Sequence, residues 1–143
     1  MAEKLNVFIA GAGGIGSATG LILREMGHRP VDLVLADLRD DTAREAADWI
    51  TSLSTRGGAV GAVAMTEGEE PDARLESALK SSHILLDCLP GSEAPRMAKW
   101  ARRFNLHYAN LTEYVRETRE VAEIAKGAST GFLLQGGLAP GYI

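Results

Sequence analysis

Directly after an apolar run at Leu5–Ala10, the chain reads Gly11-Ala12-Gly13-Gly14-Ile15-Gly16. The run before the glycines is apolar almost throughout, which is typical of a strand covered on both faces. The residues after them, Ser17–Met26, place apolar side chains at helical spacing. Glycines spaced as GxGxxG between a buried strand and a helix are typical of a loop that binds the pyrophosphate of a dinucleotide.

Each glycine of this loop has a physical reason in that interpretation. Gly11 permits the tight turn out of the strand, and Gly13 has no side chain to hold a pyrophosphate away from the backbone. Gly16 lets the helix pack closely on the strand. Gly14 and Ile15 present unpaired N–H groups at the positive end of the helix dipole. The alternative is a tight turn with no ligand, and the strand-loop-helix context favours the binding loop.

Short strand-like runs alternate with helical patterns along the rest of the chain. Further strands are expected at Val31–Ala36, Ala59–Met65, Ser82–Asp87, Leu106–Asn110 and Gly131–Gln135. Further helices are expected from an Asp40-Asp41-Thr42 cap to Leu53, at Pro71–Leu79, from Ser92 or Glu93 to Phe104, and at Glu113–Lys126. This alternation predicts one α/β domain over residues 1–143, a doubly wound parallel sheet of six strands in the Rossmann order 3-2-1-4-5-6, with three layers α/β/α.

An acidic residue follows the second predicted strand. Asp37 lies about 20 residues after Gly16, where a carboxylate accepts hydrogen bonds from the adenosine ribose. The same charge repels the 2′-phosphate of NADP, so NAD is the expected cofactor. NADP stays possible, because Arg39 has the reach to stack on adenine or to bind a 2′-phosphate. Arg39 also has a plain alternative as a solvated charge beside Asp40 and Asp41. Leu38, between Asp37 and Arg39, completes this group of candidate cofactor contacts.

The loop after the fourth strand is expected to flank the same ligand. Ligands of doubly wound sheets lie outside the carboxyl ends of the strands, where the strand order reverses. Cys88, Leu89 and Pro90 therefore become candidate contacts near the nicotinamide ribose; the alternative is an ordinary Pro-Gly turn. Cys88 is the only cysteine and has no Cys-x-x-Cys partner, so a small buried thiol is expected rather than a nucleophile.

The composition of the chain limits the kinds of partner that it is expected to bind. The formal net charge is −4, which gives no basic excess to suit nucleic acid or an anionic membrane surface. The apolar runs are too short to span a bilayer. A single cysteine fits a reducing compartment, and the cytoplasm is the expected location. No cluster of His, Cys, Asp and Glu has the spacing of metal ligands, so no metal is expected.

Three stretches together resemble the NAD(P)-binding N-terminal domain of the saccharopine dehydrogenase family. They are the glycine loop, Leu106-His107-Tyr108-Ala109-Asn110-Leu111-Thr112-Glu113-Tyr114, and Gly136-Gly137-Leu138-Ala139-Pro140-Gly141. The likeness spans nearly the whole chain. It implies an NAD(P)-dependent oxidoreductase acting on the CH–NH bond of an amino-acid conjugate.

The resemblance also implies what lies outside this chain. In that family the Pro-Gly segment leads into a second domain, which supplies most contacts to a small amino-acid-like substrate and the interface of a homodimer. The chain ends at Ile143, so we expect it to be part of a longer enzyme and inactive alone. The catalytic residues are therefore unknown.

Two other classes of protein share parts of this pattern. A stand-alone nucleotide-sensing module of a transport system has the same glycine loop and acidic residue, but the terminal glycine-rich segment argues against it. An S-adenosylmethionine-dependent methyltransferase also uses an acidic residue after the second strand. Its glycine loop usually reads GxGxG, whereas Ile15 stands at the third glycine position here.

Overall fold

Six parallel strands form a single sheet in the order β3-β2-β1-β4-β5-β6, in a computed structural model that describes residues 3–136. The strands are β1 (Leu5–Ala10), β2 (Val31–Asp37), β3 (Val60–Ala64), β4 (Ile84–Asp87), β5 (His107–Asn110) and β6 (Phe132–Leu133). Every neighbouring pair is parallel. The predicted strand order is confirmed, and the order reverses between β1 and β4.

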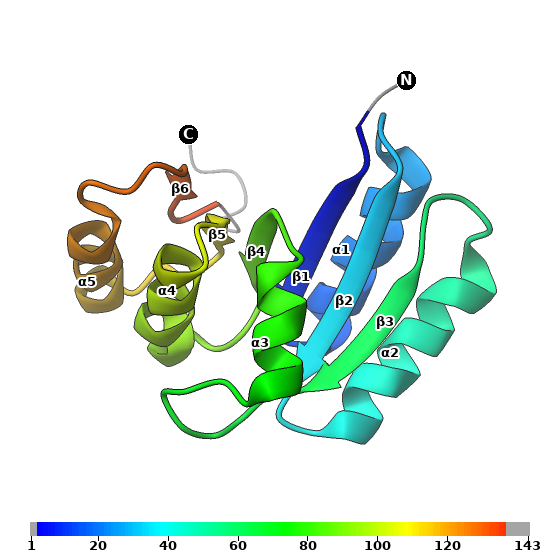
Figure 1. Ribbon diagram of the computed structural model, residues 1–143, viewed down its shortest axis with the longest axis horizontal. Coiled ribbons are helices and arrows are strands. Elements are labelled where there is room, and N and C mark those ends of the chain that lie inside the picture. The colour runs from blue at the N-terminus through cyan, green and yellow to red at the C-terminus, as the bar shows by residue number, and fades with distance from the viewer. Residues whose placement is uncertain (1–2, 137–143) are drawn as a thin grey trace.

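Helices cover both faces of this sheet, which confirms the predicted α/β/α layers. They are α1 (Gly14–Met26), α2 (Asp40–Leu53), α3 (Ala73–Lys80), the 3₁₀ turn η1 (Gly91–Glu93), α4 (Ala94–Arg103) and α5 (Val115–Ala125). In Figure 1, α1 lies behind the sheet, whereas α3 and α4 lie in front of it. Opposite faces follow from right-handed crossovers that run in two directions from β1.

Two helix starts differ from the sequence prediction for local reasons. Helix α1 already begins at Gly14, because the N–H of Ser17 bonds to the Gly13 carbonyl at 2.9 Å and closes the first turn. Helix α3 begins at Ala73, after Pro71, because the Asp72 carboxylate accepts the Leu75 N–H at 2.8 Å and caps the helix.

The expected cap of α2 is also shifted. Arg39 is the N-cap residue and makes no side-chain cap bond. Asp40 and Asp41 instead lie in the first turn, where their negative charges face the positive end of the helix dipole.

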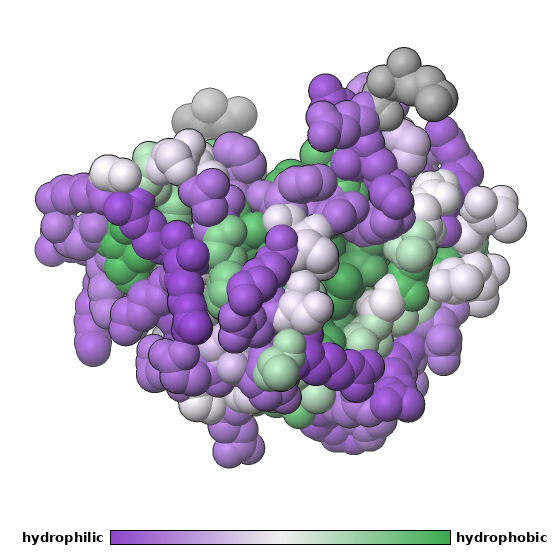
Figure 2. Space-filling model, in the orientation of Figure 1, coloured by the Kyte–Doolittle hydropathy of each residue, from purple (hydrophilic) through white to green (hydrophobic). Residues whose placement is uncertain are grey.

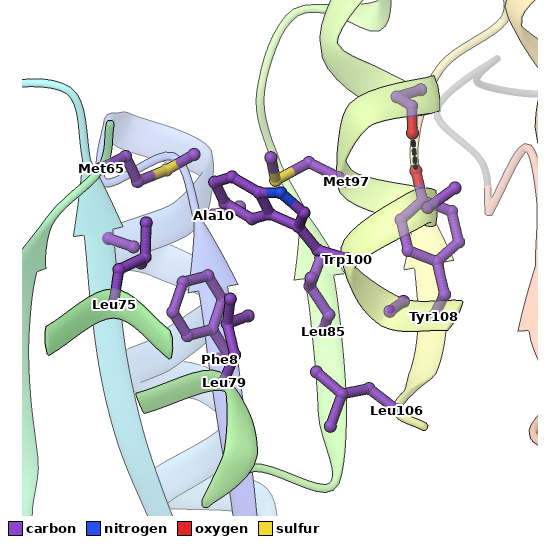
Figure 3. Packing of buried hydrophobic residues seen from close by; sticks show 14 of the residues in the cluster. Phe8, Ala10, Met65, Leu75, Leu79, Leu85, Met97, Trp100, Leu106 and Tyr108 are labelled. Carbon is purple, nitrogen blue, oxygen red and sulfur yellow. Dashed lines mark hydrogen bonds between the residues drawn. The ribbon is translucent and has the colours of Figure 1, made fainter. Parts of the chain in front are cut away.

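Two apolar clusters hold the layers together. One lies between the sheet and α1 and α2, and the larger lies between the sheet and α3, α4 and α5. Figure 3 shows the larger cluster, where side chains from β1, β4, β5, α3 and α4 converge. Its buried members include Phe8, Leu75, Leu79, Leu85, Met97, Trp100 and Tyr108. On the outside of these helices, hydrophilic side chains predominate and apolar ones are recessed between them (Figure 2).

Candidate functional site

Two glycines of the loop after β1 are required by the fold itself. Gly11 has a φ of +94°, and a Cβ there would lie 2.9 Å from the Cys88 carbonyl carbon. A Cβ at Gly16 would overlap the Gly11 carbonyl oxygen. Gly11 therefore supplies the left-handed turn, and Gly16 supplies the close approach of α1 to the turn, as the sequence predicts.

The other two glycines of the loop have no such reason in the fold. A Cβ at Gly13 or Gly14 would meet no atom within 4 Å, and Gly13 has an ordinary extended backbone with φ of −73°. No side chain caps α1 at Gly13, so the N–H groups of its first turn have no helical partner. Open space over unpaired N–H groups at a helix N-terminus is what a pyrophosphate group requires.

Asp37 lies at the end of β2, against the glycine loop. Its Oδ2 accepts the Ala12 N–H at 3.0 Å, and its Oδ1 accepts the Arg39 N–H at 3.1 Å. The carboxylate therefore fastens the end of β2 to the loop after β1. Each oxygen keeps a lone pair, so Asp37 still has capacity to accept the hydroxyl of a ribose.

Arg39 is paired with a neighbouring residue. Its Nε and Nη2 donate to the two carboxylate oxygens of Asp41 at 3.1 and 2.6 Å, and its side chain is 72% exposed. The Arg39 guanidinium lowers the pKa of the Asp41 carboxyl. This matches the solvated-charge alternative for Arg39. Its contact with adenine or a 2′-phosphate stays a prediction, as does that of the exposed Leu38.

A cavity of about 260 Å³ opens beside the glycine loop, at the point where the strand order reverses. Its lining comes from the start of α1, the loop after β4 and the loop after β5: Ile15, Cys88, Leu89, Gly91, Leu111, Thr112, Glu113 and Tyr114. Three of the predicted contacts, Ile15, Cys88 and Leu89, thus meet at one cavity. Pro90 is not part of this lining; it precedes η1, and its carbonyl accepts the Glu93 N–H at 2.9 Å.

The loop after β5 is a wall of the site that the sequence prediction missed. A Cβ at Gly91 would overlap Thr112 Oγ1 and would lie 2.6 Å from the Tyr114 ring, so the loops after β4 and β5 are in close contact. The signal was available, because β5 neighbours β4 in the predicted order and its carboxyl end lies at the same edge.

A buried polar network lies beneath these two walls. The Tyr108 hydroxyl donates to Asp87 Oδ2 at 2.7 Å and accepts from Asn110 Nδ2 at 3.1 Å. It also lies 3.4 Å from the Ala94 carbonyl, the bond dashed in Figure 3. Burial raises the pKa of Asp87 to about 6, although its bonds to Tyr108 and to the Leu89 N–H lower it. Burial also raises the pKa of the Cys88 thiol to about 11, which keeps it protonated at neutral pH.

Other kinds of site find no support in residues 3–136. No group of three or more His, Cys, Asp and Glu side chains in that range is arranged to hold a metal ion. Within the same residues, no helix combines the length and the apolar character needed to cross a bilayer.

The fold and the glycine loop together define a Rossmann-type dinucleotide-binding domain. Residues 7–132 match the family described as the saccharopine dehydrogenase NADP binding domain, and the chain belongs to that family. The resemblance seen in the sequence is thereby confirmed, and the chain is an NAD(P)-binding domain of the oxidoreductase type. The Gly137–Gly141 segment used for that resemblance lies outside the described residues.

Solved structures share the fold at low sequence identity. Saccharopine dehydrogenase (L-Glu forming) from Saccharomyces cerevisiae has a TM-score of 0.72 at 18% identity, over 96% of this chain and 28% of the yeast chain. Shikimate dehydrogenase from Mycobacterium tuberculosis has a TM-score of 0.69 at 20% identity, over 94% of this chain and 47% of the mycobacterial chain. GenD2 from gentamicin A biosynthesis, in complex with NAD, has a TM-score of 0.65 at 16% identity, over 94% of this chain and 35% of the GenD2 chain. This chain spans less than half of each of them, and a search of curated protein sequences finds no match.

Proposed function

We propose that this domain binds the dinucleotide of an NAD(P)-dependent oxidoreductase that acts on the CH–NH bond of an amino-acid conjugate. The observation that carries the binding site is the open space over Gly13 and Gly14, which nothing in the fold requires. The family match favours CH–NH chemistry, and it favours a dehydrogenase over a nucleotide-sensing regulatory module.

In this proposal, different residues bind different parts of the cofactor. The N–H groups of Gly14 and Ile15 bind the pyrophosphate, and Asp37 accepts the adenosine ribose hydroxyls. Leu89 and Tyr114 line the cavity for the nicotinamide half and exclude water from one side of it. When bound, the cofactor supplies the hydride acceptor or donor. No catalytic residue is assigned within residues 3–136.

Charge at the ribose position favours NAD over NADP. The Asp37 carboxylate would repel a 2′-phosphate placed beside it. Arg39, the cation best placed to offset that repulsion, is occupied by Asp41 at 2.6 Å. We infer a preference for NAD, which a titration with NAD⁺ and NADP⁺ tests. Equal affinity for both would contradict it.

An uncovered apolar face supports the further proposal that another domain supplies the substrate contacts. On β4 and β5, Leu85 and Tyr108 are buried beneath α4, whereas Ile84 and Leu86 on the opposite face line open cavities. Leu133 on β6 lines the same cavities and is 63% exposed. Parallel sheets are normally covered on both faces, and exposed apolar surface of this kind marks an interaction site.

The assay for this division of labour is NADH formation from saccharopine. We expect the 143-residue chain to bind the dinucleotide but to give no steady-state turnover, because the amino-acid-like substrate contacts and a homodimer interface come from elsewhere in the protein. Turnover by the chain alone would refute the need for a further domain, and would leave the cofactor site intact.

A further inference from the structure

Three polar side chains are buried together at the carboxyl ends of β4 and β5. Asp87, Tyr108 and Asn110 are 3%, 1% and 2% exposed. They form a chain of hydrogen bonds from the Asn110 amide through the Tyr108 hydroxyl to the Asp87 carboxylate. The side chains around them are largely apolar, such as Leu85 and Met97, so this network lies in a region where polar groups are costly.

The network connects both walls of the cofactor cavity. Asp87 Oδ1 accepts the N–H of Leu89 at 3.1 Å, and Leu89 lines the cavity. At the other end, Asn110 directly precedes Leu111–Tyr114, the second wall. Asn110 Oδ1 also accepts the Gln135 N–H at 3.0 Å, which anchors the network to the segment after β6.

Few charges near Asp87 offset the cost of its burial. The elements packed around it contribute Glu93 from η1, Arg96 from α4, Tyr108 from β5 and Cys88 from its own loop. Glu93 opposes ionisation of Asp87 and Arg96 favours it, and these two are paired with each other at 2.6 Å. The α1 side of Asp87 faces a cavity bordered by the uncharged Thr19. Tyr108 is therefore the principal group that fixes the carboxylate.

We infer that Asp87 is a positioning residue of the dinucleotide site, whose ionised carboxylate holds the Leu89 wall in place for the nicotinamide half of the cofactor. The inference rests on the proposed placement of the cofactor in the cavity. A charged acceptor bonds an N–H more strongly than a neutral one. Protonation of Asp87 therefore loosens the Leu89 wall and weakens the binding of NAD⁺.

The test compares two ligands across pH. NAD⁺ and ADP-ribose share the adenosine, the pyrophosphate and the second ribose, but only NAD⁺ carries the nicotinamide ring. We expect the affinity for NAD⁺ to fall about fivefold from pH 8 to pH 5, the difference between a charged and a neutral hydrogen bond. The affinity for ADP-ribose is expected to fall less than that for NAD⁺, because ADP-ribose lacks the nicotinamide ring and its pyrophosphate and adenosine contacts lie at the glycine loop and Asp37.

Substitutions separate positioning from a purely structural role. Asp87→Asn removes the charge and is expected to bind NAD⁺ weakly at every pH, with no pH dependence. Tyr108→Phe removes the donor that stabilises the carboxylate, so the midpoint of the pH profile moves to higher pH. Asp48→Asn, an exposed change on α2, is the matched control and keeps the wild-type profile.

The possible failures are distinguishable. A flat NAD⁺ profile in the wild type, wild-type binding by Asp87→Asn, or an ADP-ribose profile that falls in parallel with that of NAD⁺ would each overturn the role of Asp87 without touching the glycine loop. Absence of binding of either ligand at every pH would overturn the dinucleotide site itself, and this inference with it.

Discussion

Replacing Asp87 by Asn is predicted to remove a cost to the stability of the fold that grows as the pH rises. Asp87 is almost fully buried, and the pKa of its carboxyl rises from an ordinary 3.8 to about 6. Each tenfold change in an ionisation constant corresponds to about 1.4 kcal/mol. Keeping this carboxylate ionised at pH 7 therefore costs the folded state about 3 kcal/mol relative to its protonated form.

The sign follows from which state holds the proton more tightly. The folded-state pKa lies above the unfolded value, so the folded chain binds this proton more tightly. The cost is absent below about pH 3.8, grows between about pH 4 and 6, and is complete above about pH 6. The free energy of unfolding of Asp87→Asn minus that of the wild type should therefore rise by about 3 kcal/mol from pH 3.5 to pH 7.

Urea denaturation followed by far-UV circular dichroism measures this difference at each pH. Subtracting the two proteins cancels other carboxyl groups, such as Asp32 and Glu76, whose lowered pKa values act in the opposite direction. A difference that stays constant with pH, or that falls as pH rises, would refute the account of Asp87 as a buried ionised group. Higher stability together with weaker NAD⁺ binding would indicate that the charge is kept for binding.

Two further predictions concern the glycine loop and the ribose position. Gly16→Ala forces a methyl group onto the Gly11 carbonyl oxygen and should destabilise the fold by about 1–3 kcal/mol, seen as a lower urea midpoint; an unchanged midpoint would contradict the close approach. Asp37→Ser removes the negative charge at the ribose and should lower the affinity for NAD⁺ while raising that for NADP⁺ relative to it; calorimetric titration checks both, and an unchanged ratio of the two affinities would remove Asp37 from the ribose site.

Much of the fold follows from local sequence signals. The alternation of apolar runs and helical patterns predicts the six strands, and the crossover rule together with the Rossmann pattern favours the order 3-2-1-4-5-6. The turn at Gly11 and the close approach at Gly16 are predicted correctly because each is set within a few residues, whereas α1 begins at Gly14, three residues before the predicted Ser17. Asp37 is identified as a candidate ribose contact from its distance along the chain to the glycine loop.

The remaining features depend on contacts between distant residues. Tyr114 and Leu89 line the same cavity only because β5 pairs with β4. The close approach at Gly91 likewise depends on both loops at once. The sequence places Arg39 close to both Asp40 and Asp41 and does not decide which of them its guanidinium binds. The structure pairs it with Asp41. The network of Asp87, Tyr108 and Asn110 likewise becomes visible only when the ends of β4 and β5 are side by side.

The central claim is that the glycine loop binds a dinucleotide, and Gly13→Val tests it most directly. A Cβ at Gly13 would meet no atom within 4 Å, so the variant should stay folded and lose at most about 1 kcal/mol of stability, because Val is a poorer N-cap residue than Gly. The same side chain blocks approach to the N–H groups of the first turn of α1, and losing about two charge-assisted hydrogen bonds should weaken NAD⁺ binding about 100-fold. Isothermal titration of both proteins with NAD⁺ gives the answer. A folded Gly13→Val variant that binds NAD⁺ as tightly as the wild type would contradict the account.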